Sequence, residues 1–377
     1  MPWEVSPVSE IRLAFVHQVE SLHCSVTKAC ADFGISRKTG YKWLKRYRQC
    51  PTEPLADRSR RPCSSAVATP ENVEKAILRV RAEYGWGARK IHAFLSDKVP
   101  NLPSAKTVGN VLRRNGCITR RPTEPRTPQF FEHAEPHQLW QCDHKGPLEV
   151  GRRKVHPLTV LDDHSRYLLA LKPCTDLTMK TAFGVLWDAF GEFGLPERLL
   201  CDNAFGTNYQ VPKTLSWFDS QLVRLGIRPI HGRPYHPQTQ GKVERLHGTL
   251  EREVWPHVRR DSLRHFEQDI DRWRLDVYNP LRPHEALGDR PPLSRFRPSP
   301  RPRPRRMPKI EYPTGSITRK VSSVGEICWR GYRIMAGGGL VGESVRIEER
   351  DHEVAVLYGW KQIRLIPHKE LKRDTML

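Results

Sequence analysis

Long apolar runs are missing from this sequence. No stretch of its 377 residues approaches the roughly 20 consecutive apolar residues that a membrane-spanning helix needs. Its first residues also lack the basic-then-apolar layout of a secretory signal. These two absences predict no membrane partner and favour a cytoplasmic location.

Paired cysteines are also missing. The nine cysteines include no C-x-x-C pair, and their odd number argues against a framework of disulfides. Cys142 and Cys201 each stand directly before an aspartate inside an apolar run. That setting is typical of small buried side chains rather than of nucleophiles or zinc ligands. We therefore expect no structural zinc.

Acidic residues are in the minority. The chain has 63 Lys and Arg against 42 Asp and Glu, which gives a formal net charge of +21. Lys and Arg release condensed counterions when they neutralise phosphates, so this excess favours a polyanionic partner such as nucleic acid. A protein that is merely basic and soluble is the alternative.

Residues 1–50 predict a DNA-binding module. A short helix ends near Phe33, Gly34 supplies a turn at positive φ, and Ser36 caps a second helix. This order is typical of a helix-turn-helix, whose second helix enters the major groove, although an ordinary helical hairpin has a similar pattern. The candidates for DNA contact are the polar residues of the second helix, Arg37, Lys38, Thr39, Lys42, Lys45 and Arg46.

Apolar positions predict how these helices pack. Ile11, Leu13 and Val16 begin an apolar stripe on the first helix, with Ala14 and Val19. Tyr41 and Leu44 suit the packed side of the second DNA-binding helix.

Composition divides the rest of the chain. Proline-rich stretches separate a second helical module from an α/β segment, and a tract of Pro and Arg precedes a run of short strands with glycine turns. We predict a multidomain protein: all-α helix-turn-helix modules, an α/β core with a mixed five-stranded sheet, and a small all-β barrel-like domain. The expected segments are 1–50 (helix-turn-helix), 51–69 (linker), 70–118 (second helical DNA-binding module), 119–133 (linker), 134–292 (core), 293–309 (basic linker) and 310–377 (β domain).

Three acids in the α/β segment stand out by position. Asp143 and Asp202 each end a short apolar strand, and the carboxyl ends of strands converge on one crevice. Glu244 follows one turn inside a predicted helix. Clustered carboxylates repel one another unless cations neutralise them, and hard oxygen ligands select magnesium or manganese. Taken singly, Asp143 has the position of a turn former and Glu244 that of a solvated surface charge.

The motifs around these acids resemble those of retroviral-type integrases and related insertion-sequence transposases. The stretch from Tyr235 to Arg245 is similar to the segment around that family's catalytic Glu. Trp140 to Asp143 resembles its first-Asp strand, Asp162 to Arg166 its hairpin turn, and Cys201 to Asn203 its second-Asp motif. These motifs stand in the family's order, which is more specific than any one of them.

The resemblance implies a DDE-type transposase with a ribonuclease-H-like core. In that reading Asp143, Asp202 and Glu244 are the catalytic residues and hold two Mg²⁺ or Mn²⁺ ions. The protein would bind transposon terminal inverted repeats, cleave the DNA ends and join the 3′-hydroxyl to target DNA. Its partners would be double-stranded DNA and further copies of itself, in a bacterial nucleoid. Lys242 and Arg245, beside Glu244, are further candidates for DNA contact.

Two other functions stay open. A catalytically inactive, DNA-binding regulator derived from a transposase would keep the helical modules and lose cleavage. A nuclease of the ribonuclease H type would act on RNA–DNA hybrids. Three intact acids argue against the regulator, and two helical modules have no evident use in the nuclease.

Overall fold

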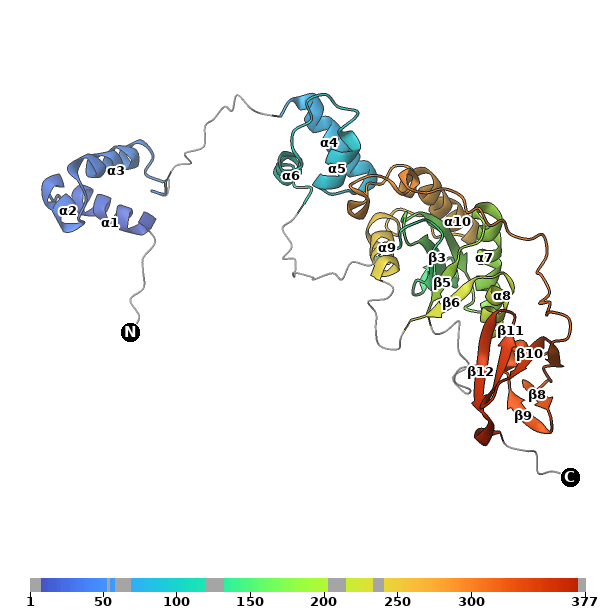
Figure 1. Ribbon diagram of the computed structural model, residues 1–377. Helices are drawn as coiled ribbons and strands as arrows, with labels where there is room; N and C mark the ends of the chain where they lie inside the picture. The colour runs from blue at the N-terminus through green and yellow to red at the C-terminus, as the bar shows by residue number, and fades with distance from the viewer. Residues whose placement is uncertain are drawn as a thin grey trace. The chain divides into compact units, whose positions relative to one another are not determined.

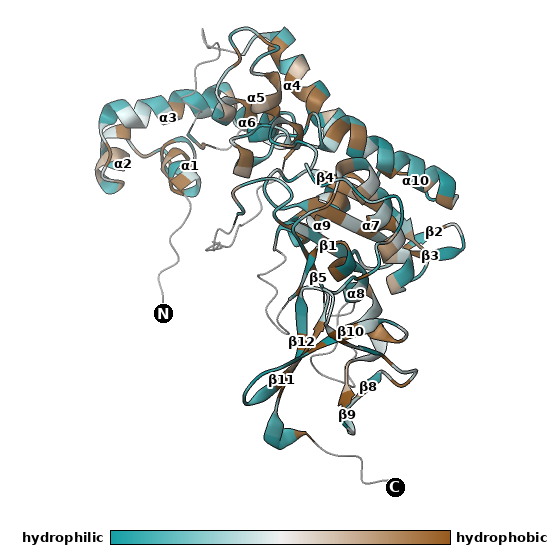
Figure 2. Ribbon diagram, turned by 45° about the vertical axis from the view of Figure 1, so that its right-hand side comes forward, coloured by the Kyte–Doolittle hydropathy of each residue, from teal (hydrophilic) through white to brown (hydrophobic). Residues whose placement is uncertain are grey.

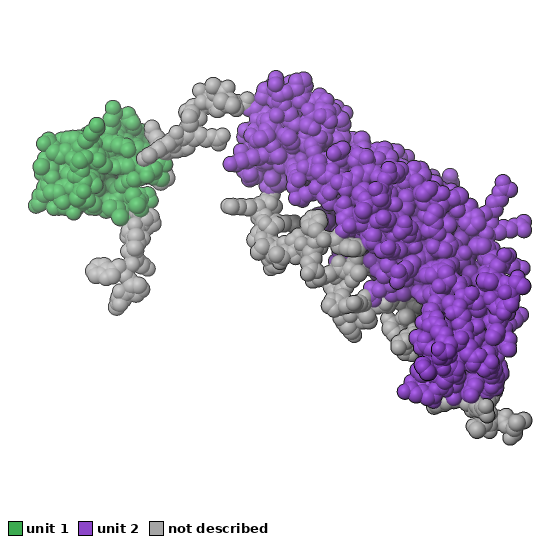
Figure 3. All heavy atoms as spheres, viewed as in Figure 1, with its two compact units in different colours: residues 1–68 green, residues 69–377 purple. Residues whose placement is uncertain are grey.

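The computed structural model describes residues 8–52, 55–57, 69–118, 132–202, 215–232 and 241–371. The chain forms two compact units, Met1–Ala68 and Thr69–Leu377 (Figure 3). Within these ranges, no helix is long and apolar enough to cross a membrane.

The first unit is a small helical bundle. Its helices are α1 (Val8–Glu20), α2 (Val26–Asp32) and α3 (Arg37–Gln49) (Figure 1). The Ser36 side chain accepts a hydrogen bond from the Thr39 backbone N–H, so α3 starts at the predicted N-cap. Gly34, at φ +63°, makes the turn between α2 and α3. The helix-turn-helix pattern thus arises from local capping and turn chemistry.

The packed faces of this bundle differ from those predicted. Tyr41 is 52% exposed, and Trp43 is buried beside Leu44 instead. Gly40, Trp43 and Leu44 lie at helical spacing on one face, and Tyr41 falls outside that face. On α1, Ile11 and Leu13 are about half exposed, at 44% and 49%, and Ala14 is exposed. Phe15 and Val16 fill the core, so the predicted apolar stripe was wrong in its first half.

The second unit begins with another bundle, the α4–α6 module, made of α4 (Glu71–Tyr84), α5 (Ala88–Leu95) and α6 (Ala105–Arg114). Gly85 ends α4 in the left-handed conformation at φ +68°. Ser104 caps α6 by accepting from the Thr107 N–H. The core of this module includes Ile77, Trp86 and Ile91.

A mixed sheet forms the centre of the second unit. Its order is β2-β3-β1-β5-β6, with β4 also paired to β3. The sheet therefore has six strands and not five, because Leu148 to Val150 folds back on β3 through a turn at Gly151 (φ +58°). The strands are β1 (Trp140–His144), β2 (Leu148–Val150), β3 (Arg153–Asp162), β4 (Leu168–Cys174), β5 (Arg198–Cys201) and β6 (Arg228–His231).

Helices cover both faces of this sheet. On one face, α7 (Met179–Phe193) and α8 (Trp217–Arg224) pack over side chains such as Cys142 and Val160. On the other, α9 (Gly241–Glu253) and α10 (Leu263–Arg272) pack over Leu161 and Leu168. In Figure 2 the ribbon of α7 carries many hydrophobic residues, whereas that of α3 is largely hydrophilic. Alternate residues of the central strands therefore face two separate apolar layers.

After α10 the chain makes a π-helical turn, η3 (Trp273–Tyr278), and two short 3₁₀ turns, η4 (Glu285–Leu287) and η5 (Pro292–Ser294). Two open sheets follow, β12-β11-β10-β7 and β8-β9, over one core that includes Trp329, Val345 and Val356. Neither sheet closes among the described strands, so the all-β part is confirmed but the barrel stays a prediction. The strands are β7 (Ile317–Lys320), β8 (Glu326–Trp329), β9 (Tyr332–Met335), β10 (Ser344–Glu349), β11 (Glu353–Tyr358) and β12 (Lys361–Pro367), with 3₁₀ turns η6 (Gly338–Leu340) and η7 (His368–Glu370).

Candidate active site

Two of the predicted acids lie on neighbouring strands. Strands β1 and β5 are parallel, with Cys142 opposite Cys201. Asp143 and Asp202 are the next residues in this register, so they emerge side by side at the carboxyl ends of the two strands. The two cysteines turn into the apolar layer under α7 and α8, as the sequence predicted for buried fillers. Strand alternation therefore directs the two acids away from that layer.

The third acid comes from the helix above this edge. Glu244 is an exposed residue in the first turn of α9. The pKa of Asp143 is raised to about 6 by burial, then by the negative charges of Asp202 and Glu244. The three acids are therefore electrostatic neighbours. Among the described residues, however, no group of three or more Asp, Glu, His or Cys side chains lies close enough together to coordinate a metal ion as the structure stands.

His247, on the next turn of α9, is linked to the backbone of Asp143 through Thr159. The Thr159 hydroxyl donates to the Asp143 carbonyl oxygen at 3.0 Å and also meets His247 Nε2 at 3.0 Å. Since the hydroxyl has one hydrogen, His247 Nε2 is the donor to it, which leaves the Nδ1 lone pair 3.9 Å from Asp143 Oδ2. Burial and the charge of Lys145 lower the pKa of His247 to about 4, so its ring is neutral at pH 7.

Lys242 is held by a buried acid. Its ammonium pairs with Asp163, a fully buried residue that also accepts from Gln141 Nε2 at 2.7 Å and from the His133 N–H at 2.9 Å. The Lys242 side chain is only 18% exposed. Its cation is therefore paired inside the protein, where it anchors the first turn of α9, and the DNA contact predicted for Lys242 stays a prediction.

Comparison with known protein families agrees with this arrangement. Residues 133–237 and 225–292 each match an integrase core domain. Asp143 and Asp202 lie in the first match and Glu244 in the second. The segment from residue 133 to residue 292, called the integrase core below, is therefore similar to integrase core domains. Residues 11–62 match a helix-turn-helix domain and residues 39–112 a homeodomain-like domain.

Individual relatives of the integrase core are retroviral polyproteins. The Pro-Pol polyprotein of feline foamy virus is 25% identical over 181 residues, which are 48% of this chain and 14% of the polyprotein. The Gag-Pro-Pol polyprotein of Mason-Pfizer monkey virus is 36% identical over 115 residues, or 30% of this chain and 6% of the polyprotein. The chain thus spans a small fraction of the length of these relatives.

Two solved structures are similar in part. An intasome of simian T-cell lymphotropic virus, solved with a PP2A regulatory subunit, is 18% identical and covers 80% of this chain and 99% of the viral one, at a TM-score of 0.36. The HTLV-2 integrase catalytic core with magnesium is 16% identical and covers 43% of this chain and 97% of that core, at a TM-score of 0.31.

The other residues predicted to contact DNA differ in how far their side chains are exposed to solvent. Arg245 is exposed on α9 of the integrase core. On α3, Arg37, Lys38, Lys42 and Lys45 are exposed. Thr39 instead closes the cap, with its hydroxyl 2.9 Å from that of Ser36. Arg46 donates to the Ala56 carbonyl oxygen at 2.6 Å and lies over the Trp43 ring, so part of its charge is used inside the module.

Sequence reasoning did not find Asp163 or Thr159, the residues that hold Lys242 and His247. Asp163 lies in the turn from Asp162 to Arg166. Its position as an acid at the end of an apolar strand is the sequence signal that could have identified it. The family-like residues Asn203, His236 and Gln238 lie outside the described residues.

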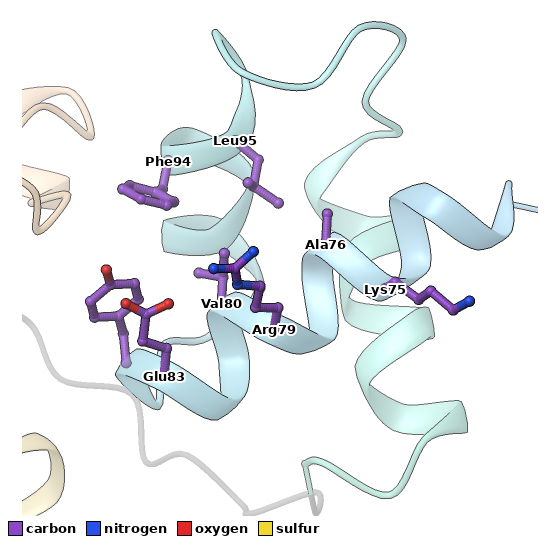
Figure 4. Close-up of a pocket in the computed structure, with 8 residues that line it drawn as sticks. Lys75, Ala76, Arg79, Val80, Glu83, Phe94 and Leu95 are labelled. Carbon is purple, nitrogen blue, oxygen red and sulfur yellow. The ribbon is translucent and has the colours of Figure 1, made fainter.

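A hollow away from the carboxylates lies between α4 and α5 (Figure 4). It has a volume of about 550 Å³ and is lined by Arg79, Glu83, Tyr84 and Phe94, among others. Its walls come only from the α4–α6 module, so it is no part of the integrase core's acidic edge.

Proposed function

We propose that this chain is a DDE-type DNA transposase. It would bind the terminal inverted repeats of a transposon, cleave the DNA ends and join the 3′-hydroxyl to target DNA. The supporting observation is the parallel register of β1 and β5, which sets Asp143 beside Asp202 where the charge of Glu244 is also felt. The matches to integrase core domains also support DNA joining as the chemistry.

The donor set suits two Mg²⁺ or Mn²⁺ ions held by Asp143, Asp202 and Glu244. Its atoms are hard carboxylate oxygens. Burial, and then the charges of Asp202 and Glu244, raise the pKa of Asp143, and a bound cation would oppose that rise. When bound, two such ions stabilise the attacking and leaving oxygens of phosphoryl transfer. Thr159, itself bonded to His247, would hold the Asp143 backbone in place, while Lys242 and Asp163 hold the start of α9.

The basic helices supply the DNA-binding part of the proposal. Helix α3 exposes Lys42 and Lys45, and α6 exposes Lys106, Asn110 and Arg113 along one side. Such residues can neutralise phosphates and reach base edges in a major groove. We propose that several copies act together on paired DNA ends, which light scattering with and without duplex ends would measure.

The test is metal-dependent cleavage and strand transfer with duplexes that carry the element's own ends. We expect Asp143→Asn, Asp202→Asn and Glu244→Gln each to abolish both reactions while DNA binding persists. Asp188→Asn and Glu192→Gln, which change exposed acids of α7, are the matched controls and should retain activity. Strand transfer by any of the three site variants would refute the assignment of that acid.

The same assay separates the alternatives. A wild-type chain that binds the ends but neither cuts nor joins them is the inactive regulator. Cleavage of RNA–DNA hybrids in preference to DNA ends would identify the nuclease.

A further inference from the structure

The α4–α6 module is joined to the far end of the helix that carries Glu244. Trp86 Nε1 donates to Glu253 Oε2 at 3.2 Å, and Lys90 Nζ donates to Oε1 at 3.3 Å. Arg282 holds the same carboxylate with two hydrogen bonds, both of 2.8 Å. We call these four residues the Glu253 junction. They tie α5, α9 and the segment after η3 to one carboxylate.

The junction is buried and reinforced. The Glu253 and Arg282 side chains are 9% and 6% exposed, and Trp86 is 1% exposed. Beside it, Arg89 bonds Glu285 at 2.5 Å and Asp289 at 2.8 Å. Val277 and Leu281 from the integrase core also pack against the apolar core of the module. The bidentate Arg282 pair holds the Glu253 carboxylate within the core in one geometry. The bonds from Trp86 and Lys90 to that carboxylate, together with the apolar packing, then hold the module against α9.

Each side of the junction leads to a surface with a proposed role. Within the module, α5 packs on α6, whose exposed Lys106, Asn110 and Arg113 share one side. Within the core, Glu253 ends the helix whose first turn holds Glu244, nine residues or about 14 Å earlier along the helix axis. A continuous set of packed elements therefore connects the basic side of α6 with the three carboxylates.

We propose that the Glu253 junction determines which phosphate of a bound DNA is cut. DNA held by α6 is presented to the carboxylates at a distance fixed by this junction, so Trp86, Arg89 and Lys90 act as positioning residues for the cut. This inference rests on the proposed transposase function. It adds a determinant of cleavage position that lies outside both the carboxylates and the DNA-contacting helix.

The experiment loosens the junction from the module side only. The variant Trp86→Phe/Arg89→Ala/Lys90→Met removes the indole donor and two cations, and it leaves the Glu253–Arg282 pair in place. Cut positions are mapped at single-nucleotide resolution on an end-labelled duplex, with DNA affinity and melting temperature measured in parallel. The matched control is Asp269→Asn, which breaks another bidentate arginine pair, with Arg259, away from the module.

We expect the wild type and the Asp269→Asn control to cut at one phosphate. The junction variant should bind DNA as tightly and spread its cuts over neighbouring phosphates, because a loosened module presents the duplex at several distances. A single unchanged cut position in a folded junction variant overturns the inference. If the triple variant does not fold, Arg89→Ala/Lys90→Met, which keeps Trp86 in its core, takes its place. A wild type that cuts no ends refutes the proposed function itself, which is a separate outcome.

Discussion

The two helical modules of this chain start their last helices, α3 and α6, in the same way but belong to different compact units. In each, a serine caps a basic helix and a threonine three residues later donates its N–H and places its hydroxyl against the serine, for Ser36 with Thr39 and for Ser104 with Thr107. The first module is a compact unit of its own, whereas the second belongs to the unit that contains the integrase core. Local sequence thus starts both helices, and bonds from Trp86, Arg89 and Lys90 join the second module to the integrase core.

The largest expected effect comes from Glu253→Gln. This change leaves the buried Arg282 and the partly buried Lys90 without their carboxylate, and breaking a buried pair costs about 3–5 kcal/mol. Hydrogen exchange of the full chain should show faster opening of α5 and α9, with α3 unchanged. Equal protection of α5 and α9 in variant and wild type would mean that the second module is held by apolar packing alone.

Acid should weaken the same junction. Burial alone would raise the pKa of Glu253, but the Arg282 hydrogen bond and the charges of Arg282 and Lys90 lower it below the ordinary 4.5. A carboxyl with a lowered folded-state pKa stabilises the fold above its unfolded pKa, and this contribution is lost as pH falls through the folded value. In the wild type, the protection of α5 from hydrogen exchange should therefore decrease once the pH is lowered below about 4.5. In Glu253→Gln that pH dependence should be absent.

Matched Gly→Ala substitutions should change the stability of the two modules in opposite directions. A Cβ on Gly40 would meet Cys30 Sγ at 2.5 Å and Phe15 Cζ at 2.9 Å, so Gly40→Ala overpacks the first module, at about 1–3 kcal/mol. A Cβ on Gly109 would meet Ala88 Cβ at an ordinary 3.5 Å, so Gly109→Ala should stabilise α6 by up to about 1 kcal/mol. Denaturant unfolding measures both, and destabilisation by Gly109→Ala would contradict the packing described for α6.

Salt dependence tests whether both modules lie on DNA. Lys42→Ala/Lys45→Ala should reduce the slope of log affinity against log salt by about 2, since each phosphate contact contributes about 0.9. Lys106→Ala/Arg113→Ala on α6 should reduce it similarly. Arg46→Ala should change it less, because the Arg46 guanidinium already bonds the Ala56 carbonyl. A slope that responds only to the α3 variant would assign the α4–α6 module a structural role.

The smallest effect belongs to the shared caps. Ser36→Ala and Ser104→Ala each remove one acceptor for a helix N–H and should cost about 1 kcal/mol. Nearly equal losses in denaturant unfolding would show that the two helices start by the same local chemistry. A much larger loss for Ser104→Ala would mean that the start of α6 is also part of its docking.

Much of the acidic edge could be predicted because its signals are local. An acid at the end of a short apolar run is visible in the sequence: Asp143 is the penultimate residue of β1, and Asp202 directly follows β5. Glu244 was predicted by resemblance, since an exposed helix residue has no distinguishing local pattern. Lys242 beside it was expected to contact DNA, and the sequence did not predict its ion pair with Asp163, 79 positions away. An ion pair at that separation leaves no periodicity that the sequence could reveal.

The sequence by itself indicated the capped helix starts, most of the order of strands and helices, and the three candidate acids. Helix caps, turns and strand alternation depend on residues close together in the chain, so the local sequence is enough to predict them. Only the tertiary structure decided that Tyr41 is exposed and Trp43 buried, that Lys242 points inward, and that Trp86 meets Glu253 167 positions later. Those outcomes depend on contacts between residues far apart in the chain. When folding buries a charged or polar group there, the group needs a partner, and only the folded structure shows which one it finds.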